Sequence, residues 1–185
     1  MRDPAHCCLP RRNLLTALAV VPLGAAAPRI AAASDAVRSL SFYHVHTDEQ
    51  LEVTYFERGK YVEDALTQVD RLLRDFRTGD VARIDPALLD ILHLTGKVCE
   101  RTRFEVISAY RSPATNSTLA DKSAGVSRNS LHLQGRAIDV RLTGYDTAKL
   151  RRACVALGLG GVGYYPASNF VHLDTGRVRA WGPPG

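Results

Sequence analysis

The sequence lacks a hydrophobic run long enough to cross a membrane, and it also lacks internal repeats, heptads and low-complexity segments. No segment reaches the roughly 18 consecutive apolar residues that a membrane-spanning helix needs. The composition is otherwise ordinary, with 45% hydrophobic and 23% charged residues among 185. These values are typical of a folded globular protein, and the length favours one domain.

The longest apolar stretch, residues 14–27, has the length of a signal-peptide core. It follows Arg11 and Arg12, and this arginine pair resembles a twin-arginine signal, which exports proteins already folded. A Sec-type signal and a frayed cytosolic N-terminus are the alternatives. Small residues at Ala31 and Ala33 predict cleavage after Ala33. We therefore expect residues 1–33 to be a cleavable export signal, residues 34–185 to form a single periplasmic domain, and no stable membrane span to remain.

Basic charge is scarce once the predicted signal is removed. The full chain carries a formal net charge of +5. Residues 1–33 contain four of the arginines and one aspartate, so the remainder has a net charge of only +2. The sequence also has no lysine-rich or aromatic-basic patch, and both observations argue against a nucleic-acid-binding protein.

Cysteine is scarce as well. Cys7 and Cys8 would leave with the signal, and Cys99 and Cys154 remain in the predicted domain. Each of the two lies in a predicted helix at a position that can face the core. Outside the cytoplasm a disulfide between them would be chemically allowed, while two buried free thiols are the alternative.

The hydrophobic pattern predicts an α+β fold with helices packed on a mostly antiparallel central sheet. A long polar loop, such as the one expected over residues 109–130, usually serves function rather than mere connection. The expected elements are a β-hairpin (38–46 and 51–58), helices (61–77, 85–102 and 146–158), and strands (104–108, 136–142 and one beginning after Pro166).

Two histidines and one aspartate sit where predicted strands meet loops. On the strand at 136–142, Asp139 projects from the face opposite Ile138, and Gly135 lets the chain turn so that His132 returns over Asp139. A second strand can supply His172. Two imidazoles and one carboxylate leave a tetrahedral zinc ion with an open position, although histidines on strands are often simply hydrogen-bonded. Zinc lowers the pKa of bound water to about 7 and polarises carbonyl groups, so the pattern favours amide hydrolysis.

Three motifs, in order along the chain, give these residues a family context, namely "SAYRS" (108–112), "SLHLQGRAID" (130–139) and "FVHLD" (170–174). They resemble the zinc D-Ala-D-Ala peptidase superfamily, which also contains lysostaphin-like and hedgehog-type domains, and more closely its exported murein endopeptidase K group. The resemblance covers roughly residues 39–182 and implies a hedgehog/D-Ala-D-Ala peptidase-like fold.

The resemblance implies a role for each matching residue. His132, Asp139 and His172 match the zinc ligands, and Arg111 matches the arginine that stabilises the developing oxyanion or holds the substrate. Asp174 is a candidate for the general base because this chain lacks one at the usual position. Relatives often carry a base two or three residues before the last zinc ligand, where this chain has Phe170 and Asn169. Asp174 is the nearest substitute, either as the general base or as a partner that orients His172.

We expect a periplasmic zinc metallopeptidase that cuts peptide crosslinks in peptidoglycan and binds peptidoglycan peptide stems or crosslinks. That it acts as an endopeptidase is implied by the resemblance alone. A wall-binding or partner-binding module with a structural or vestigial zinc site is one alternative, and a D,D-carboxypeptidase is another. Tyr164 and Tyr165 can donate to an oxyanion or pack in the groove. We interpret the "HVH" segment at 44–46 as hairpin packing or groove lining rather than a second metal site. The sequence does not indicate an oligomeric state.

Overall fold

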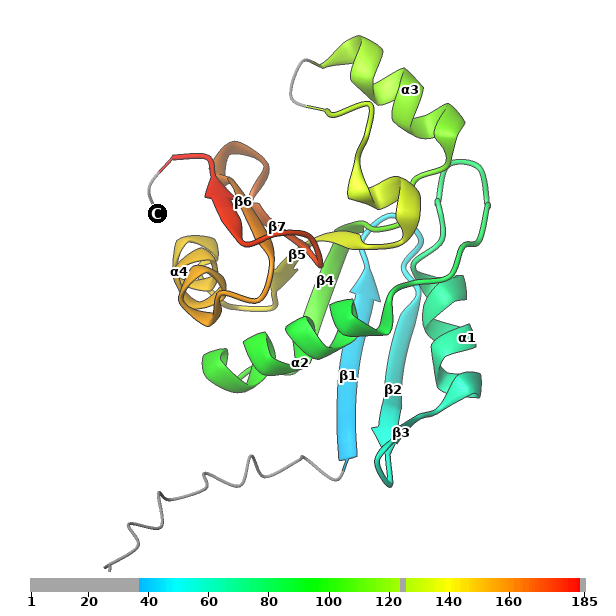
Figure 1. Ribbon diagram of the computed structural model, residues 1–185, viewed down its shortest axis with the longest axis vertical. Helices are drawn as coiled ribbons and strands as arrows, with labels where there is room; N and C mark the ends of the chain where they lie inside the picture. Colours follow the sequence, from blue (N-terminus) through cyan, green and yellow to red (C-terminus); the bar gives the residue numbers. More distant parts are fainter. Residues whose placement is uncertain (1–36, 124–125, 184–185) are drawn as a thin grey trace, which may run out of the picture. The chain divides into compact units, whose positions relative to one another are not determined.

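The computed structural model describes residues 37–123 and 126–183. The predicted export signal, residues 1–33, lies outside the described residues. Within them, a single sheet of eight strands forms in the order β3-β2-β1-β4-β5-β7-β6-β8 (Figure 1). The strands are β1 (Val37–His44), β2 (Gln50–Glu57), β3 (Lys60–Tyr61), β4 (Arg103–Ser108), β5 (Ala137–Leu142), β6 (Gly161–Tyr165), β7 (Phe170–Asp174) and β8 (Arg179–Trp181).

The sheet is mixed, so the prediction of a mostly antiparallel sheet was wrong in this respect. β1 pairs with β4 in parallel, and β6 pairs with β8 in parallel. A parallel pair needs a long crossover connection, and the segment between β2 and β4, which contains two helices, provides it for the first pair. The predicted hairpin is present as β1 and β2, which pair antiparallel. The α+β class predicted from the sequence is confirmed.

Three helices cover the sheet. They are α1 (Glu63–Leu72), α2 (Pro86–Cys99) and α4 (Thr147–Leu157), and they pack on β2, on β1 and on the β5–β7–β6 strands respectively (Figure 1). Two of these helices begin at an aspartate whose side chain caps the first turn. Asp85 accepts a hydrogen bond from the Ala87 amide, and Asp146 accepts one from the Lys149 amide.

The core lies between these helices and the sheet. Alternate residues of β5 and β7 enter it, namely Ile138, Val140, Val171 and Leu173, each at most 1% exposed. Each such side chain contributes about 1.5–3 kcal/mol by leaving water. Because side chains alternate between the two faces of a strand, the residues between them, including Asp139, point away from the core.

The prediction of a long loop at 109–130 was wrong, because this segment contains helix α3 (Pro113–Lys122) and is followed by the short 3₁₀ turn η1 (Leu131–Gln134). Ser112 caps α3 by accepting from the Thr115 amide, and Pro113 occupies its first turn. The sequence of α3 is polar almost throughout, so hydrophobic periodicity could not reveal it. Only the cap residues carried the signal.

Other differences concern short elements that were not predicted and the end of one helix. Strands β3, β6 and β8 were missed, because each is short or rich in glycine. Helix α1 ends at Leu72, five residues before the predicted end. A second 3₁₀ turn, η2 (Pro166–Ser168), precedes β7.

Cys99 and Cys154 are both buried, as predicted, and both are free thiols rather than a disulfide. The Cys154 sulfur lies 3.8 Å from the Thr95 hydroxyl. Burial raises the pKa of Cys154 to about 12, so this thiol stays protonated and unreactive.

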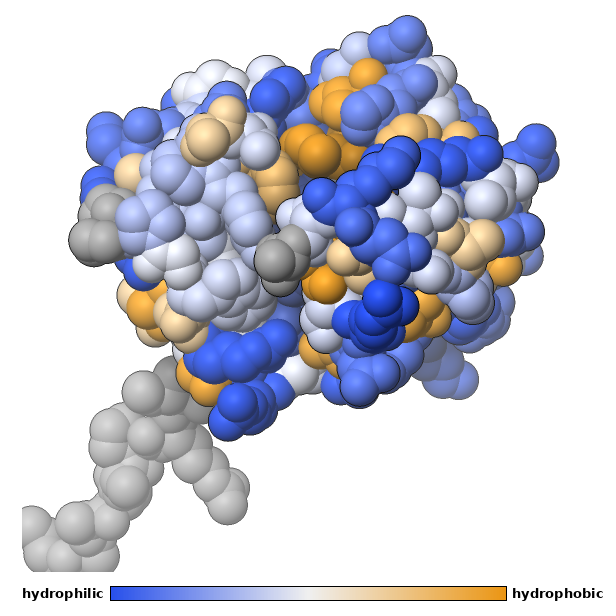
Figure 2. Space-filling model, turned by 90° about the horizontal axis from the view of Figure 1, so that it is seen from above, coloured by the Kyte–Doolittle hydropathy of each residue, from blue (hydrophilic) through white to orange (hydrophobic). Residues whose placement is uncertain are grey.

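Polar residues cover most of the face seen in Figure 2. Hydrophobic residues appear only as small separate groups on this face. Among the described helices, none combines the length and the apolar character needed to cross a bilayer.

Candidate metal centre

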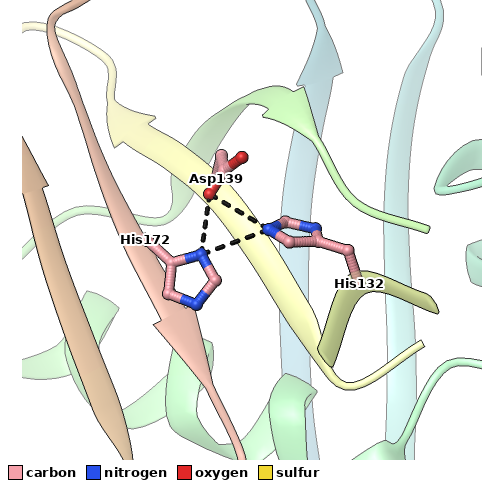
Figure 3. A group of neighbouring side chains, drawn as sticks. All are labelled: His132, Asp139 and His172. Carbon is pink, nitrogen blue, oxygen red and sulfur yellow. Dashed lines mark hydrogen bonds and ion pairs between the residues drawn. The ribbon is translucent and has the colours of Figure 1, made fainter. Parts of the chain in front are cut away.

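Three side chains from separate segments meet on the sheet face opposite the core. Asp139 of β5 and His172 of β7 are direct cross-strand neighbours, and His132 comes from η1 (Figure 3). His172 Nδ1 lies 2.9 Å from Asp139 Oδ1 and 3.2 Å from His132 Nε2, and His132 Nε2 lies 3.3 Å from Asp139 Oδ1. The structure thus brings together the three residues that the sequence suggested as ligands.

The short turn before β5 positions His132. Ser130 caps η1 through the His132 amide, and Gly135 ends it with φ +65°. A Cβ atom on Gly135 would lie only 2.1 Å from the Arg83 carbonyl oxygen, so only glycine fits at this point. The sharp turn returns the His132 ring over β5, as the sequence predicts.

Hydrogen bonds to the far nitrogens define which ring atoms face the cluster. His132 Nδ1 donates to the Ala109 carbonyl oxygen at 2.5 Å, and a carbonyl can only accept. His132 therefore presents the lone pair of Nε2 to its neighbours. His172 Nε2 donates to Asp174 Oδ2 at 3.0 Å, so this ring presents Nδ1.

Burial and the contacts within the cluster shift the pKa values of its three residues. Burial lowers the pKa of His132 and keeps it neutral. Burial alone would raise the pKa of Asp139, but the two imidazoles hold it well below its usual range. For His172, the hydrogen bonds to Asp139 and Asp174 outweigh burial and raise the pKa. One neutral imidazole and one ionised carboxylate are therefore ready to act as ligands at neutral pH.

The donor set fits a divalent cation. Three electron-pair donors, one from each residue, lie within 4.8 Å of one another. Ligands about 2 Å from a tetrahedral zinc ion lie about 3.3 Å apart, close to the observed separations. The other polar atoms of all three residues are held by hydrogen bonds, as is usual around protein metal sites.

Arg111 supports the carboxylate of this cluster. Its Nη2 donates to Asp139 Oδ2 at 2.5 Å, and its Nε donates to Ser108 Oγ at 3.0 Å. The Arg111 amide also donates to the His132 carbonyl oxygen, which ties the two segments together. The guanidinium thus lies beside the candidate ligands, and among the described residues Nη1 has no hydrogen-bond acceptor.

Asp174 is almost completely enclosed by donors. Oδ1 accepts from the amides of Gly161 and Gly176 at 3.2 and 2.8 Å, while His172 donates to Oδ2. Arg179 donates to both oxygens, at 3.0 and 2.7 Å. Burial would raise the pKa of Asp174, but hydrogen bonds from His172 and Arg179 lower it well below its usual range.

The cluster opens into a cleft with a volume of about 420 Å³. Aromatic side chains form one wall. Tyr165 and Phe170 stack with ring centroids 4.7 Å apart, and Trp181 donates from Nε1 to the Tyr165 hydroxyl at 3.0 Å. The Trp181 ring lies 5.2 Å from the His172 ring. An aromatic wall beside a few polar groups is typical of a ligand-binding pocket.

Sequence reasoning missed Arg179 and Trp181, which belong to an undetected strand. The signal that could have found them is the glycine-rich segment 158–163, which precedes the missed strands. Tyr165 lines the cleft as suggested, whereas Tyr164 packs against the core. In the "HVH" segment, His44 is buried and His46 stacks on Phe76 at 4.2 Å, which is a packing role.

Two histidines and a carboxylate at the floor of a cleft place the protein in the class of metal-dependent hydrolases, whose catalytic sites combine three such ligands with one open position. The comparisons with known proteins name the family. The pattern described as peptidoglycan L,D-endopeptidase MepK matches residues 32–181. The chain therefore belongs to the peptidoglycan L,D-endopeptidase MepK family.

Individual relatives agree with this assignment. The peptidoglycan L,D-endopeptidase MepK of Escherichia coli is 40% identical over 176 residues, which cover 92% of this chain and 96% of the relative. The same protein of Shigella flexneri gives the same values. A probable peptidoglycan L,D-endopeptidase MepK of Haemophilus influenzae is 39% identical over 146 residues, 78% of each chain. No solved structure matches.

Proposed function

We propose that this protein is a zinc-dependent peptidoglycan endopeptidase that cleaves peptide crosslinks of the bacterial cell wall. The family membership and the relatives' names support the substrate and the reaction. The observation that carries the proposal is the convergence of three electron-pair donors at the floor of an open cleft. By analogy with those names, the bond cleaved joins an L- to a D-configured centre.

His132, Asp139 and His172 would hold the metal ion through Nε2, Oδ1 and Nδ1. A bound zinc ion would supply a Lewis acid and an activated water molecule for amide hydrolysis. The protein contributes the orientation of each ligand. Ala109, Arg111 and Asp174 hold the three outer atoms, so the donors need little rearrangement to receive the ion.

Arg111 has two tasks in this proposal. Its contact with Asp139 fixes the carboxylate that would bind the metal. Its remaining nitrogen, Nη1, is the group that can donate to a substrate oxygen in the cleft, because a guanidinium stays charged and offers several donors in one plane. This combination extends the role that the resemblance implied for Arg111.

Asp174 acts as a positioning residue for His172 rather than as the general base. Five hydrogen bonds occupy its two oxygens, and its pKa is lowered, so it is a poor proton acceptor. Its contact with His172 favours the tautomer that is protonated at Nε2. The lone pair of Nδ1 then faces Asp139. Of the two roles left open by the sequence, the contacts favour this one.

A periplasmic location follows from the substrate, because peptidoglycan lies outside the cytoplasmic membrane. The arginine pair and the apolar stretch at residues 14–27 support export as a folded protein, with cleavage after Ala33. Residues 34–185 then form the single metallopeptidase domain.

Cleavage of purified crosslinked muropeptides tests the function. The full protein should release uncrosslinked stems in the presence of zinc. Cleavage should stop when chelator is added and resume when zinc is restored. His172→Ala should abolish the reaction, while His93→Ala, on helix α2 outside the cleft, serves as the control for a lost histidine.

The products separate the alternatives. Binding of muropeptides without turnover would favour a wall-binding module. Release of a single terminal D-alanine from uncrosslinked stems, with crosslinks left intact, would instead identify a D,D-carboxypeptidase. Mass spectrometry of the products distinguishes these results from crosslink cleavage.

A further inference from the structure

Strand β8 reaches the candidate metal ligands across the intervening strand β6. In the sheet, Gly161 of β6 lies between Asp174 and Arg179, its partners on β7 and β8. In the next row of the same face, Gly163 separates two side chains in the same way. Side chains of β8 can therefore pass over β6 only because β6 carries no side chains there.

The space above Gly161 is fully used. A Cβ atom at this position would lie 2.3 Å from Arg179 Nη1 and 2.4 Å from Asp174 Oδ2. A Cβ atom on Gly163 would lie 2.6 Å from the Trp181 ring. The two glycines are thus required by contacts between their neighbours, since neither has the positive φ that would call for glycine.

Arg179 makes the most specific of these contacts. It donates Nη1 to Asp174 Oδ1 and Nη2 to Asp174 Oδ2, the two-point geometry of a strong guanidinium–carboxylate pair. The Asp174 side chain is 0% exposed, and Arg179 is one-third exposed. The guanidinium also lies 4.9 Å from the Trp181 ring centroid, so an aromatic ring further limits its movement.

We propose that Arg179 is a positioning residue of the metal centre, and that Gly161 is the residue that gives it access. Arg179 fixes the plane of the Asp174 carboxylate, Asp174 fixes the tautomer and orientation of His172, and His172 then presents Nδ1 to the ion. This inference rests on the proposed function, because it assumes that His172 is a ligand.

The zinc dissociation constant of the folded protein tests the inference. Loss of a group that orients a metal ligand weakens metal affinity about 10–100-fold. Arg179→Ala should weaken zinc affinity by about 10-fold, the lower end of this range, because the Gly161 and Gly176 amides still hold Asp174. Arg179→Lys keeps the charge but not the two-point geometry, so it should recover part of the affinity. Competition with a chromophoric chelator measures each constant.

Two further variants sharpen the test. Arg177→Ala removes an exposed arginine from the same turn and should change zinc affinity less than about twofold, the matched control. Gly161→Ala leaves Arg179 chemically intact but pushes it from Asp174, and it should weaken zinc binding at least as much as Arg179→Ala. Thermal melts in chelator establish that each variant is folded before its affinity is measured.

The outcomes separate this inference from the proposed function. If the unmodified protein binds no zinc, the proposed function itself fails. If it binds zinc and Arg179→Ala binds equally tightly, the metallopeptidase proposal stands and the positioning role is wrong. A purely structural arginine would lower the melting temperature by the same amount with and without zinc and leave the dissociation constant unchanged.

Discussion

Replacing Asp139 by asparagine should destabilise the metal-free protein far more than an isosteric change normally does. Asp139 and Arg111 form a buried ion pair, with side chains only 5% and 12% exposed. The amide keeps the size of the side chain and one acceptor but removes the negative charge. Breaking a buried pair from one side costs about 3–5 kcal/mol, because the remaining charge stays buried without compensation. Since the amide can still accept one hydrogen bond from Arg111, we expect about 3 kcal/mol.

Urea denaturation in the presence of chelator measures this loss without a metal contribution. For a domain of this size the free energy of unfolding falls by about 1–3 kcal/mol per molar urea, so the midpoint should drop by at least about 1 M. Asp121→Asn is the matched control. Asp121 pairs with Arg128 at 2.8 Å, but the two side chains are 59% and 73% exposed.

An exposed pair contributes only about 0–1 kcal/mol, so the control should barely move the midpoint. If Asp139→Asn loses no more stability than Asp121→Asn, the Arg111–Asp139 contact does not carry the energy that its burial implies. The same variant should bind zinc much more weakly, because a charged ligand is gone. Retention of tight zinc binding would remove Asp139 from the ligand set.

Two further predictions concern binding and pH. Zinc at about 100 times its dissociation constant should stabilise the protein by about 3 kcal/mol. Bound zinc should also change the fluorescence emission of Trp181, the single tryptophan, because its ring lies 5.2 Å from the His172 ring. Identical emission with and without zinc would argue against a metal beside His172. Burial lowers the pKa of His44 to about 4, whereas the pKa in the unfolded chain is about 6.5. The stability that neutral His44 contributes is therefore complete above about pH 6.5 and should fall by about 2 kcal/mol as the pH drops to 4.5, because the unfolded chain binds the proton more tightly. His44→Phe should lose less stability over that range in urea titrations, and equal losses would contradict a buried neutral His44.

Local signals in the sequence were sufficient for most of the scaffold. The alternation in β5 assigned Ile138 and Asp139 to opposite faces, and the helix predicted over residues 85–102 begins at Asp85, which caps α2. These features depend on a residue and its near neighbours, so periodicity and capping rules can find them. Helix α3 escaped because it buries little apolar surface, and β8 escaped because three residues carry too little pattern to define a strand.

The sequence by itself also determined which residue types were available for the candidate centre, since His132, Gly135 and Asp139 lie within one short segment. Only the tertiary structure decided how they are supported. Sheet register placed His172 opposite Asp139, and it aligned two glycines of β6 beneath Arg179 and the only tryptophan of the chain. Register depends on pairing between strands distant in sequence, and such contacts leave no periodic trace in any one of the segments that make them.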